Sequence, residues 1–296
     1  MLKLLIVIFL ISSTNAYFFK SIFFKNKNLK NRLTIFEETK TMINQKNSYG
    51  FLSTISNQKK IDGYPQTSIV GYSCDNIGNP IVCLSDIAMH TNNIKTNDHV
   101  AIGINEKFFR NANDMRSTFI GDLKKVEDKE EISFLKQKFI DSHDDAFYLN
   151  FQDFNVYKLN TKYISLNGGF GRAYNINLEK YYDAEPDAIC LNSNYLVNEL
   201  NKFFSKEIES YLNTKINEDI ISYEIKKIDK YGFDIRLYLK GDYMFTKVHR
   251  ILFNKTVTEE NLKEEILEKL KINPKLNKVQ NWISKFFSNF MFLLGV

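Results

Sequence analysis

The sequence contains little cysteine and little proline, and its first 32 residues contain no acidic side chain. The three cysteines, Cys74, Cys83 and Cys190, form neither a disulfide framework nor a C-x-x-C metal motif. Cys74 and Cys83 flank a predicted turn, so the alternatives there are a cross-strand bridge or two buried thiols. The thin cysteine usage favours buried thiols.

The formal charge of +5 comes from the N-terminus. Residues 1–32 carry six Lys or Arg, and the remaining residues carry 34 basic against 35 acidic side chains. A nearly neutral body does not generate the positive field of a nucleic-acid-binding protein. We therefore expect no nucleic-acid partner.

The N-terminus has the pattern of a targeting leader. Lys3 is followed by the apolar run Leu4–Ile11 and by small or polar residues that end at Ala16, which predicts a signal peptide over residues 1–16. The run is shorter than the ~20 residues of a membrane-spanning helix, so no transmembrane helix is expected in the mature chain. Residues 17–32 are basic and aromatic, and we interpret them as a transit-like segment.

The stretch Gly63–Ile94 is the centre of the predicted fold. Gln66–Tyr72 and Pro80–Leu84 are predicted to be strands, and the turn-rich run Asp75–Pro80 between them should reverse the chain. Ser85 and a polar cluster that ends in His90, Thr91, Asn92 and Asn93 follow directly. A buried hairpin that gathers hydroxyls, an imidazole and amides at one end is suited to binding an anion.

The rest of the first half has alternating and helical patterns of apolar residues. Helices are predicted over Leu33–Ile43, at the polar stretch that ends with Asn92–Asp98, and over Glu127–Ile140; strands are predicted over Tyr49–Ile55, Val100–Ile104, Arg116–Gly121, Phe154–Leu159 and Tyr163–Leu166.

Two further features supply candidate ligand-binding residues. Arg116 and Thr118 share one face of a predicted strand. A cation and a hydroxyl there suit a phosphate or a carboxylate, and the alternative is an exposed strand face with an incidental ion pair. The run GGFGRA begins at Gly168 but lacks the third glycine and the βαβ context of a dinucleotide loop. Its glycines predict a tight turn, and Arg172 is either an anion partner or a surface arginine.

After the linker Asp183–Pro186 the pattern changes. Asn192–Asn213 predicts one long helix, and Thr256–Glu259 has the spacing of a capping box before a last helix. Three strands are predicted to form a half-buried antiparallel meander: Ile220–Ile228, Phe233–Leu239 and Met244–Leu252. The strand histidine His249 is interpreted as a structural residue.

The motifs G-x-P-x-x-S at Gly63, S-x-x-A-x-H-T-x-N-I at Ser85, R-x-T-x-x-G at Arg116 and GGFGRA at Gly168 resemble those of the pyridoxamine-phosphate-oxidase-like split barrels. Within that superfamily the chain is most similar to the haem-utilisation (HugZ-type) and CREG-like branch. The resemblance implies an α+β, mainly β fold. It predicts a split-barrel domain over residues 33–182 and a small α+β domain with a three-stranded antiparallel meander over 187–273. The composition of residues 274–296 predicts an apolar tail.

The same resemblance implies a small-molecule cofactor, FMN or haem, with FMN preferred, and a homodimer with pockets at the subunit boundary. It implies an oxidoreductase of flavin or tetrapyrrole chemistry, either an FMN-dependent enzyme or a haem-degrading oxygenase-like protein, without naming a catalytic residue. No metal ligand set is predicted. The expected cofactor-binding residues are Ser68, Ser85, His90, Thr91, Asn93, Arg116, Thr118, Gly169 and Arg172.

A non-catalytic alternative follows from plastid relatives, which resemble haem-responsive regulators that bind an enzyme of tetrapyrrole synthesis. Related small domains carry N-x-D-H on their first helix, whereas this chain has Asn192-Ser193-Asn194-Tyr195. The leader resembles that of proteins sent through the secretory route into an apicoplast-type plastid. Secretion, or retention in the endomembrane lumen, is the alternative.

Overall fold

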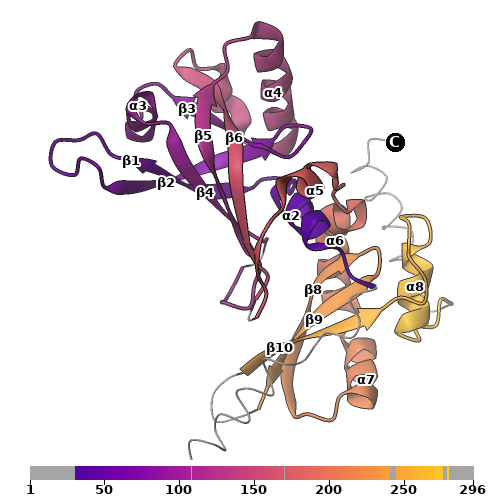
Figure 1. Cartoon of the computed structure of the whole chain (residues 1–296). Coiled ribbons are helices and arrows are strands. Elements are labelled where there is room, and N and C mark those ends of the chain that lie inside the picture. The colour runs from indigo at the N-terminus through magenta and orange to yellow at the C-terminus, as the bar shows by residue number, and fades with distance from the viewer. Residues whose placement is uncertain (1–30, 108, 170, 241–244, 276–278, 280–296) are drawn as a thin grey trace, which may run out of the picture. The chain divides into compact units, whose positions relative to one another are not determined.

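Six antiparallel strands close into a barrel in the first half of the chain (Figure 1). The structure, a computed structural model, describes residues 31–275 and residue 279, except residues 108, 170 and 241–244. The strand order is β3-β2-β1-β4-β5-β6, and β3 pairs with β6 to close the barrel; β7 extends from β6. The strands are β1 (Tyr49–Ile55), β2 (Pro65–Cys74), β3 (Pro80–Ser85), β4 (His99–Asn105), β5 (Arg116–Lys125), β6 (Phe154–Asn167) and β7 (Ala173–Asn175).

The predicted hairpin forms as β2 and β3. Tyr72 lies opposite Val82 and Cys74 opposite Pro80. The Asp75 carboxylate fixes the turn, because it accepts the backbone N–H groups of Ile77 at 3.1 Å and Asn79 at 2.8 Å. The chain therefore reverses where the turn residues predicted it.

One prediction about the barrel strands is wrong. Residues 154–166 were expected to form two strands, but β6 is continuous and pairs with β5 from Tyr157 to Asn167. The polar residues near Thr161 belong to a bulge, where the register shifts between Ile120 and Gly121. Gly121 permits the bulge, since a Cβ there would lie 2.2 Å from the Asn160 carbonyl oxygen.

Alternate residues of these strands fill the barrel, and helices cover its ends and one side. Leu52, Ile102 and Phe119 have no exposed surface, and burying such a side chain contributes about 1.5–3 kcal/mol. The helices are α2 (Ile35–Ile43), α3 (Met89–Thr96), α4 (Lys129–Ser142), a 3₁₀ turn η2 (Ala146–Asn150) and α5 (Leu178–Asp183). Helix α2 begins with a capping box, in which Thr34 and Glu37 satisfy each other's backbone N–H groups.

The second half contains a three-stranded sheet, called here the small sheet, with strand order β10-β9-β8. Its strands are β8 (Ile220–Asp229), β9 (Gly232–Leu239) and β10 (Phe245–Leu252), and its helices are α6 (Ala188–Phe203), α7 (Ser205–Lys215) and α8 (Leu262–Lys269). The α+β, mainly β fold with an antiparallel meander is confirmed.

Three predictions for this half are corrected. The single helix over 192–213 is two helices, because Phe204 leaves the helical conformation and inserts a fully buried ring into the core beneath the sheet. The meander is not uniformly half-buried, since Asp234 and Arg236 on β9 are as buried as their apolar neighbours. Helix α8 begins at the N-cap Asn261, so the Thr256 capping box does not form.

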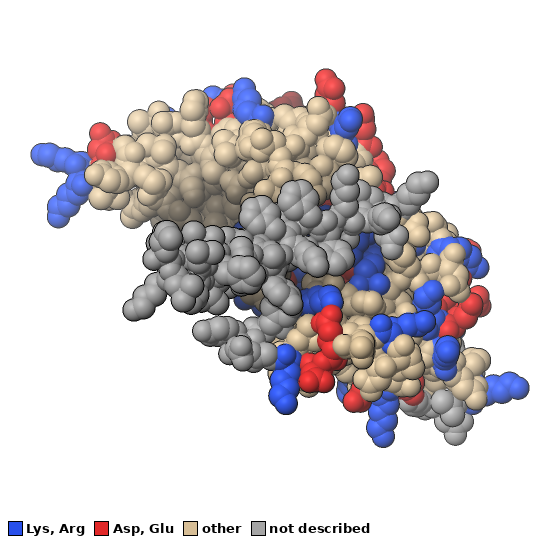
Figure 2. All heavy atoms as spheres, turned by 60° about the horizontal axis from the view of Figure 1, so that its bottom comes forward, with Lys and Arg blue, Asp and Glu red and all other residues tan. Residues whose placement is uncertain are grey.

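Cys74, Cys83 and Cys190 are free and buried, as favoured. Among the described residues, no helix is long and apolar enough to cross a membrane. The predicted leader, residues 1–32, lies outside the described residues except for its last two positions. Most of the predicted tail, residues 274–296, lies outside them as well. Outside the grey atoms of Figure 2, basic and acidic side chains of the described residues are interspersed.

Candidate functional site

The β2–β3 hairpin and α3 bring Ser68 and His90 together, with 3.2 Å between the Ser68 Oγ and the His90 Nδ1. Ser68 lies opposite Leu52, a core residue, so it belongs to the inner face of the barrel wall. Burial lowers the pKa of His90, which favours the neutral imidazole. This pair is a polar contact at the end of the barrel that α3 covers.

Thr91 and Asn93 lie on the same helix and are fully buried. The Asn93 amide donates to Thr54 at 3.0 Å and to Gln66 at 2.9 Å, and its oxygen accepts the Asn57 N–H. These bonds attach α3 to β1 and β2. Among the described residues, no hydrogen-bond partner faces the Thr91 hydroxyl.

Ser85, at the end of β3, donates its hydroxyl proton to the Asp153 carboxylate. Its oxygen also lies 3.4 Å from the Ile87 N–H. Both contacts hold the turn from β3 into α3, so Ser85 is engaged within the chain.

Arg116 and Thr118 share a face of β5, as predicted, and it is the outer face of the barrel wall. Their neighbours Ser117 and Phe119 are buried on the inner face. The Arg116 Nη1 donates to the backbone oxygens of Ala112 at 3.1 Å and Asp114 at 3.3 Å. The guanidinium is therefore held by the preceding loop and keeps further donors for a ligand.

Gly169 and Arg172 form the turn between β6 and β7. Gly169 has a φ of +106°, and a Cβ there would lie 2.8 Å from the Asn113 carbonyl oxygen, so only glycine fits. Arg172 pairs with the buried Glu38 at 2.6 Å. Burial acts to lower the pKa of Arg172, but the Glu38 charge outweighs it and raises the pKa.

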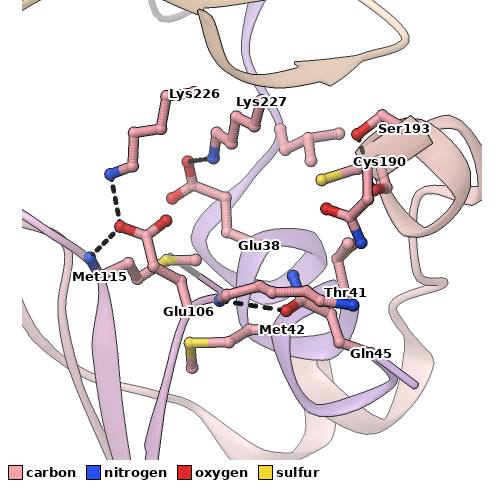
Figure 3. A pocket seen from close by; sticks show the side chains of 13 residues that line it. Glu38, Thr41, Met42, Gln45, Glu106, Met115, Cys190, Ser193, Lys226 and Lys227 are labelled. Atoms are coloured by element: carbon pink, nitrogen blue, oxygen red, sulfur yellow. Dashed lines mark hydrogen bonds and ion pairs between the residues drawn. The ribbon is translucent and has the colours of Figure 1, made fainter. Parts of the chain in front are cut away.

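The nine predicted residues thus fall into separate places. Ser68 and His90 meet on the inner side of the wall, and Arg116 and Thr118 meet on the outer side, but the two pairs do not meet each other. Neither of two cavities found among the described residues is lined by any of the nine. One cavity, about 30 Å³, lies among Glu38, Glu106, Lys226 and Lys227 (Figure 3); the other, about 420 Å³, lies beside β8. The roles of the nine residues in cofactor binding stay predictions.

A cluster of three groups could in principle hold a metal ion at the end of β4. Ligand atoms of Asp98, His99 and Asp122 lie within 4.8 Å of one another. However, Lys124 pairs with Asp98, and Lys162 pairs with Asp122 at 3.2 Å. The lysines already neutralise both carboxylates, so we interpret the cluster as an ion-pair network.

Sequence reasoning missed an apolar face on the outside of the barrel, the outer sheet face, defined by the outward side chains of β1, β2, β4, β5 and β6. In register, Ile69, Phe51, Gly103, Thr118 and Ser165 form one row across it, and Thr67, Ser53, Ala101, Ile120 and Tyr163 form the next. The exposed fractions of its large apolar side chains run from 40% to 70%, namely Tyr49, Phe51, Ile69, Ile120 and Tyr163.

The middle of the outer sheet face is lower than its margins, because the side chains there are small. Gly103 and Ala101 lie between Phe51 on one side and Ile120 on the other, and a Cβ at position 103 would meet nothing closer than 3.6 Å. Five strands spaced ~4.8 Å apart extend for about 19 Å along the barrel wall, which curves over that distance. The small centre leaves space above Gly103, and Arg116 lies at the margin of the face, where a guanidinium can bind an acidic group.

A signal for this face exists in the sequence. On β1, Tyr49 and Phe51 alternate with Gly50 and Leu52, so large apolar residues occupy the outward positions as well. An exposed apolar patch of this kind marks an interaction site more often than a solvated surface.

Comparisons with known proteins agree with this architecture. Residues 37–183 match the family model described as CREG, beta-barrel. The chain is 26% identical over 215 residues to the protein named non-canonical heme oxygenase HOZ, chloroplastic, of Arabidopsis thaliana; the match covers 71% of this chain and 65% of that protein.

Among solved structures, the fold is similar to that of a heme-binding protein from Mycobacterium smegmatis, with a TM-score of 0.56 and 22% identity. That match covers 81% of this chain and 97% of the other. Residues 37–183 of this chain, the barrel, therefore match the CREG family, and the predicted resemblance is confirmed.

Proposed function

We propose that this protein binds haem on the outer sheet face. The observation that carries the proposal is an exposed apolar surface with two small residues, Ala101 and Gly103, at its centre. Its large side chains would otherwise remain in water, at a cost of about 25 cal/mol for each Å² of apolar surface. Two relatives named for heme support haem as the occupant over FMN.

Arg116 fits the acidic edge of haem, because its guanidinium lies at the margin of this face and is already oriented by two carbonyls. Tyr163 on the face, and His99 at the end of β4, carry the side-chain types that ligate haem iron. Bound haem would supply redox chemistry, while the protein supplies binding and orientation. Whether the protein degrades haem or only responds to it is a separate question.

Haemin titration of residues 33–296 tests the proposal. We expect a saturable Soret band, and we expect Gly103→Leu to abolish it, because the new side chain fills the low centre of the face without backbone strain. Arg116→Ala should weaken binding about tenfold, the loss of one charge-assisted contact. Lys60→Ala, a charge removed from an exposed turn, is the control and should bind as the wild type does. Full binding by Gly103→Leu would refute the site.

We further propose a homodimer in which a second copy meets the margin of this face, so that haem is bound at the subunit boundary, as the family resemblance implies. The exposed Ile69, at the edge of the face, is the matched probe. Light scattering should show a dimer for residues 33–296 and a monomer for Ile69→Lys. A monomeric wild type would overturn this part of the proposal.

We also infer a plastid destination, reached through the secretory pathway by the leader over residues 1–32. The chloroplastic relative supports the destination, and the charged and apolar pattern of the leader supports the route. A fluorescent protein fused after residue 32 should enter the plastid. Release into the medium would favour secretion instead.

A further inference from the structure

We infer that Arg236 and Lys226 of the small sheet are positioning residues for Arg116, acting through the loop Glu106–Met115. The inference rests on the proposed function, since it assigns a role to the arginine that binds the haem edge. It connects two sheets whose strands are far apart in the sequence.

The contact centres on Asp114, which has no exposed surface. Its carboxylate contacts the Lys226 Nζ at 2.8 Å and pairs with Arg236, which is 2% exposed. It also accepts the backbone N–H groups of Arg110 at 2.6 Å and Asn111 at 3.0 Å. One buried carboxylate therefore fixes its own loop and binds two cations of the small sheet.

Lys226 also holds the two ends of the loop. Lys226 also pairs with Glu106, whose carboxylate accepts the Met115 N–H at 2.7 Å. The backbones of Glu106 and Met115 bond to each other at 2.9 Å. Figure 3 shows Lys226 directed at Glu106 beside the Met115 backbone.

The pKa of Asp114 reports the strength of this arrangement. Burial acts to raise that pKa, but the hydrogen bond and charge of Lys226, with the Arg110 and Asn111 N–H groups, lower it to about 2. The carboxylate is thus ionised throughout the physiological range. A buried ionised group of this kind tolerates few alternative arrangements of its partners.

Arg116 depends on the loop for its position. Both carbonyls that hold its guanidinium, those of Ala112 and Asp114, belong to the loop. A free arginine side chain samples many rotamers, and ordering it on binding lowers the affinity. If Asp114 moves, the acceptors move, and the guanidinium loses its orientation toward the outer sheet face.

A second contact holds the opposite side of the loop. The Asn113 amide donates to Thr246 on β10 at 3.3 Å, and its carbonyl packs on Gly169. The loop is therefore enclosed by the small sheet and by the β6–β7 turn. This contact also gives the GGFGRA glycines a role that does not require a ligand.

A double-mutant cycle on the haemin dissociation constant tests the inference. Arg236→Met should weaken haemin binding about fivefold to tenfold in the wild-type background and leave it unchanged in the Arg116→Ala background, because the effect passes through Arg116. Equal weakening in both backgrounds would overturn the inference. Arg236→Lys, which keeps the charge but not the two-nitrogen contact, gives an intermediate loss and serves if Arg236→Met does not fold.

Arg250→Met is the matched control for simple destabilisation. Arg250 is 8% exposed and pairs with Asp229 and Asp234, both within the small sheet. Its loss should lower the melting temperature as Arg236→Met does, without changing haemin affinity. Equal loss of affinity in both variants would reduce Arg236 to a structural residue.

A readout without haemin separates this inference from the proposed function. The Nε–Hε signal of Arg116 in a ¹H–¹⁵N spectrum, assigned with Arg116→Lys, should shift toward that of a free arginine in Arg236→Met and stay in place in Arg250→Met. If the wild type does not bind haemin, the proposed function fails and this spectrum alone decides the positioning. An unmoved signal in Arg236→Met would overturn it.

Discussion

The barrel and the small sheet bury side chains of different kinds. The barrel interior is filled by apolar side chains such as Leu52, Ile102 and Phe119, whose contacts have no direction. In the small sheet, β9 places apolar residues on one face and the charged pair Asp234 and Arg236 on the other, and both faces are buried. The difference indicates that the barrel supplies a rigid surface, whereas buried charges set the position of the loop beside it.

The substitution Asp114→Ala tests this comparison with the largest expected loss of stability. It leaves Arg236 and Lys226 without their shared carboxylate, and removing one partner of a buried ion pair costs about 3–5 kcal/mol. The free energy of unfolding, measured with urea, should fall by that amount. A loss below about 1 kcal/mol would mean that the pairs of Asp114 with Arg236 and Lys226 contribute no more than surface ion pairs do.

A conservative deletion in the barrel should cost less. Ile102 has no exposed surface, and Ile102→Val removes one buried methylene group, worth about 0.5–1.5 kcal/mol. Because no charge is involved, this loss should be the same at pH 3 and pH 7. A strong dependence on pH would show that the barrel core is coupled to a titrating group.

The pH dependence distinguishes the two regions directly. The folded-state pKa of Asp114, about 2, lies below its ordinary value, so its contribution is complete above the unfolded pKa of about 4 and is lost as the pH falls through the folded value. The stability gap between the wild type and Asp114→Asn should therefore be constant from pH 7 to pH 5 and shrink toward pH 2. A gap that grows on acidification would contradict the assignment.

The smallest effect is expected at an exposed ion pair beside the small sheet. Lys247 and Glu218 are 47% and 41% exposed, and such pairs contribute about 0–1 kcal/mol. Lys247→Met should change the free energy of unfolding by less than 1 kcal/mol, and less still in 1 M salt. A larger loss would mean that the contrast between buried and exposed pairs does not hold here.

Much of the fold could be predicted because it is encoded locally. Alternation and turn residues predicted β1, the β2–β3 hairpin and the shared face of Arg116 and Thr118. Continuity was harder to predict. The bulge in β6 looks like a turn in sequence, and a helical pattern runs through the break at Phe204.

The site was less predictable, because it depends on which side of the barrel wall is the core. Alternation places Ser68 on one side of its strand but does not say that this side is the interior. The ion cluster was not predictable at all, since it joins Asp114 to Arg236 across 122 residues. Charged residues at alternate positions of an apolar strand, as in β9, were the available signal.

The central claim is that the outer sheet face is the haem surface, and the position of the iron tests it most directly. Anomalous diffraction at the iron edge from crystals of residues 33–296 with haemin should place the iron above Ala101 and Gly103, outside the barrel wall. An iron peak beside His90 at the covered end of the barrel, or in the cavity beside β8, would contradict the account.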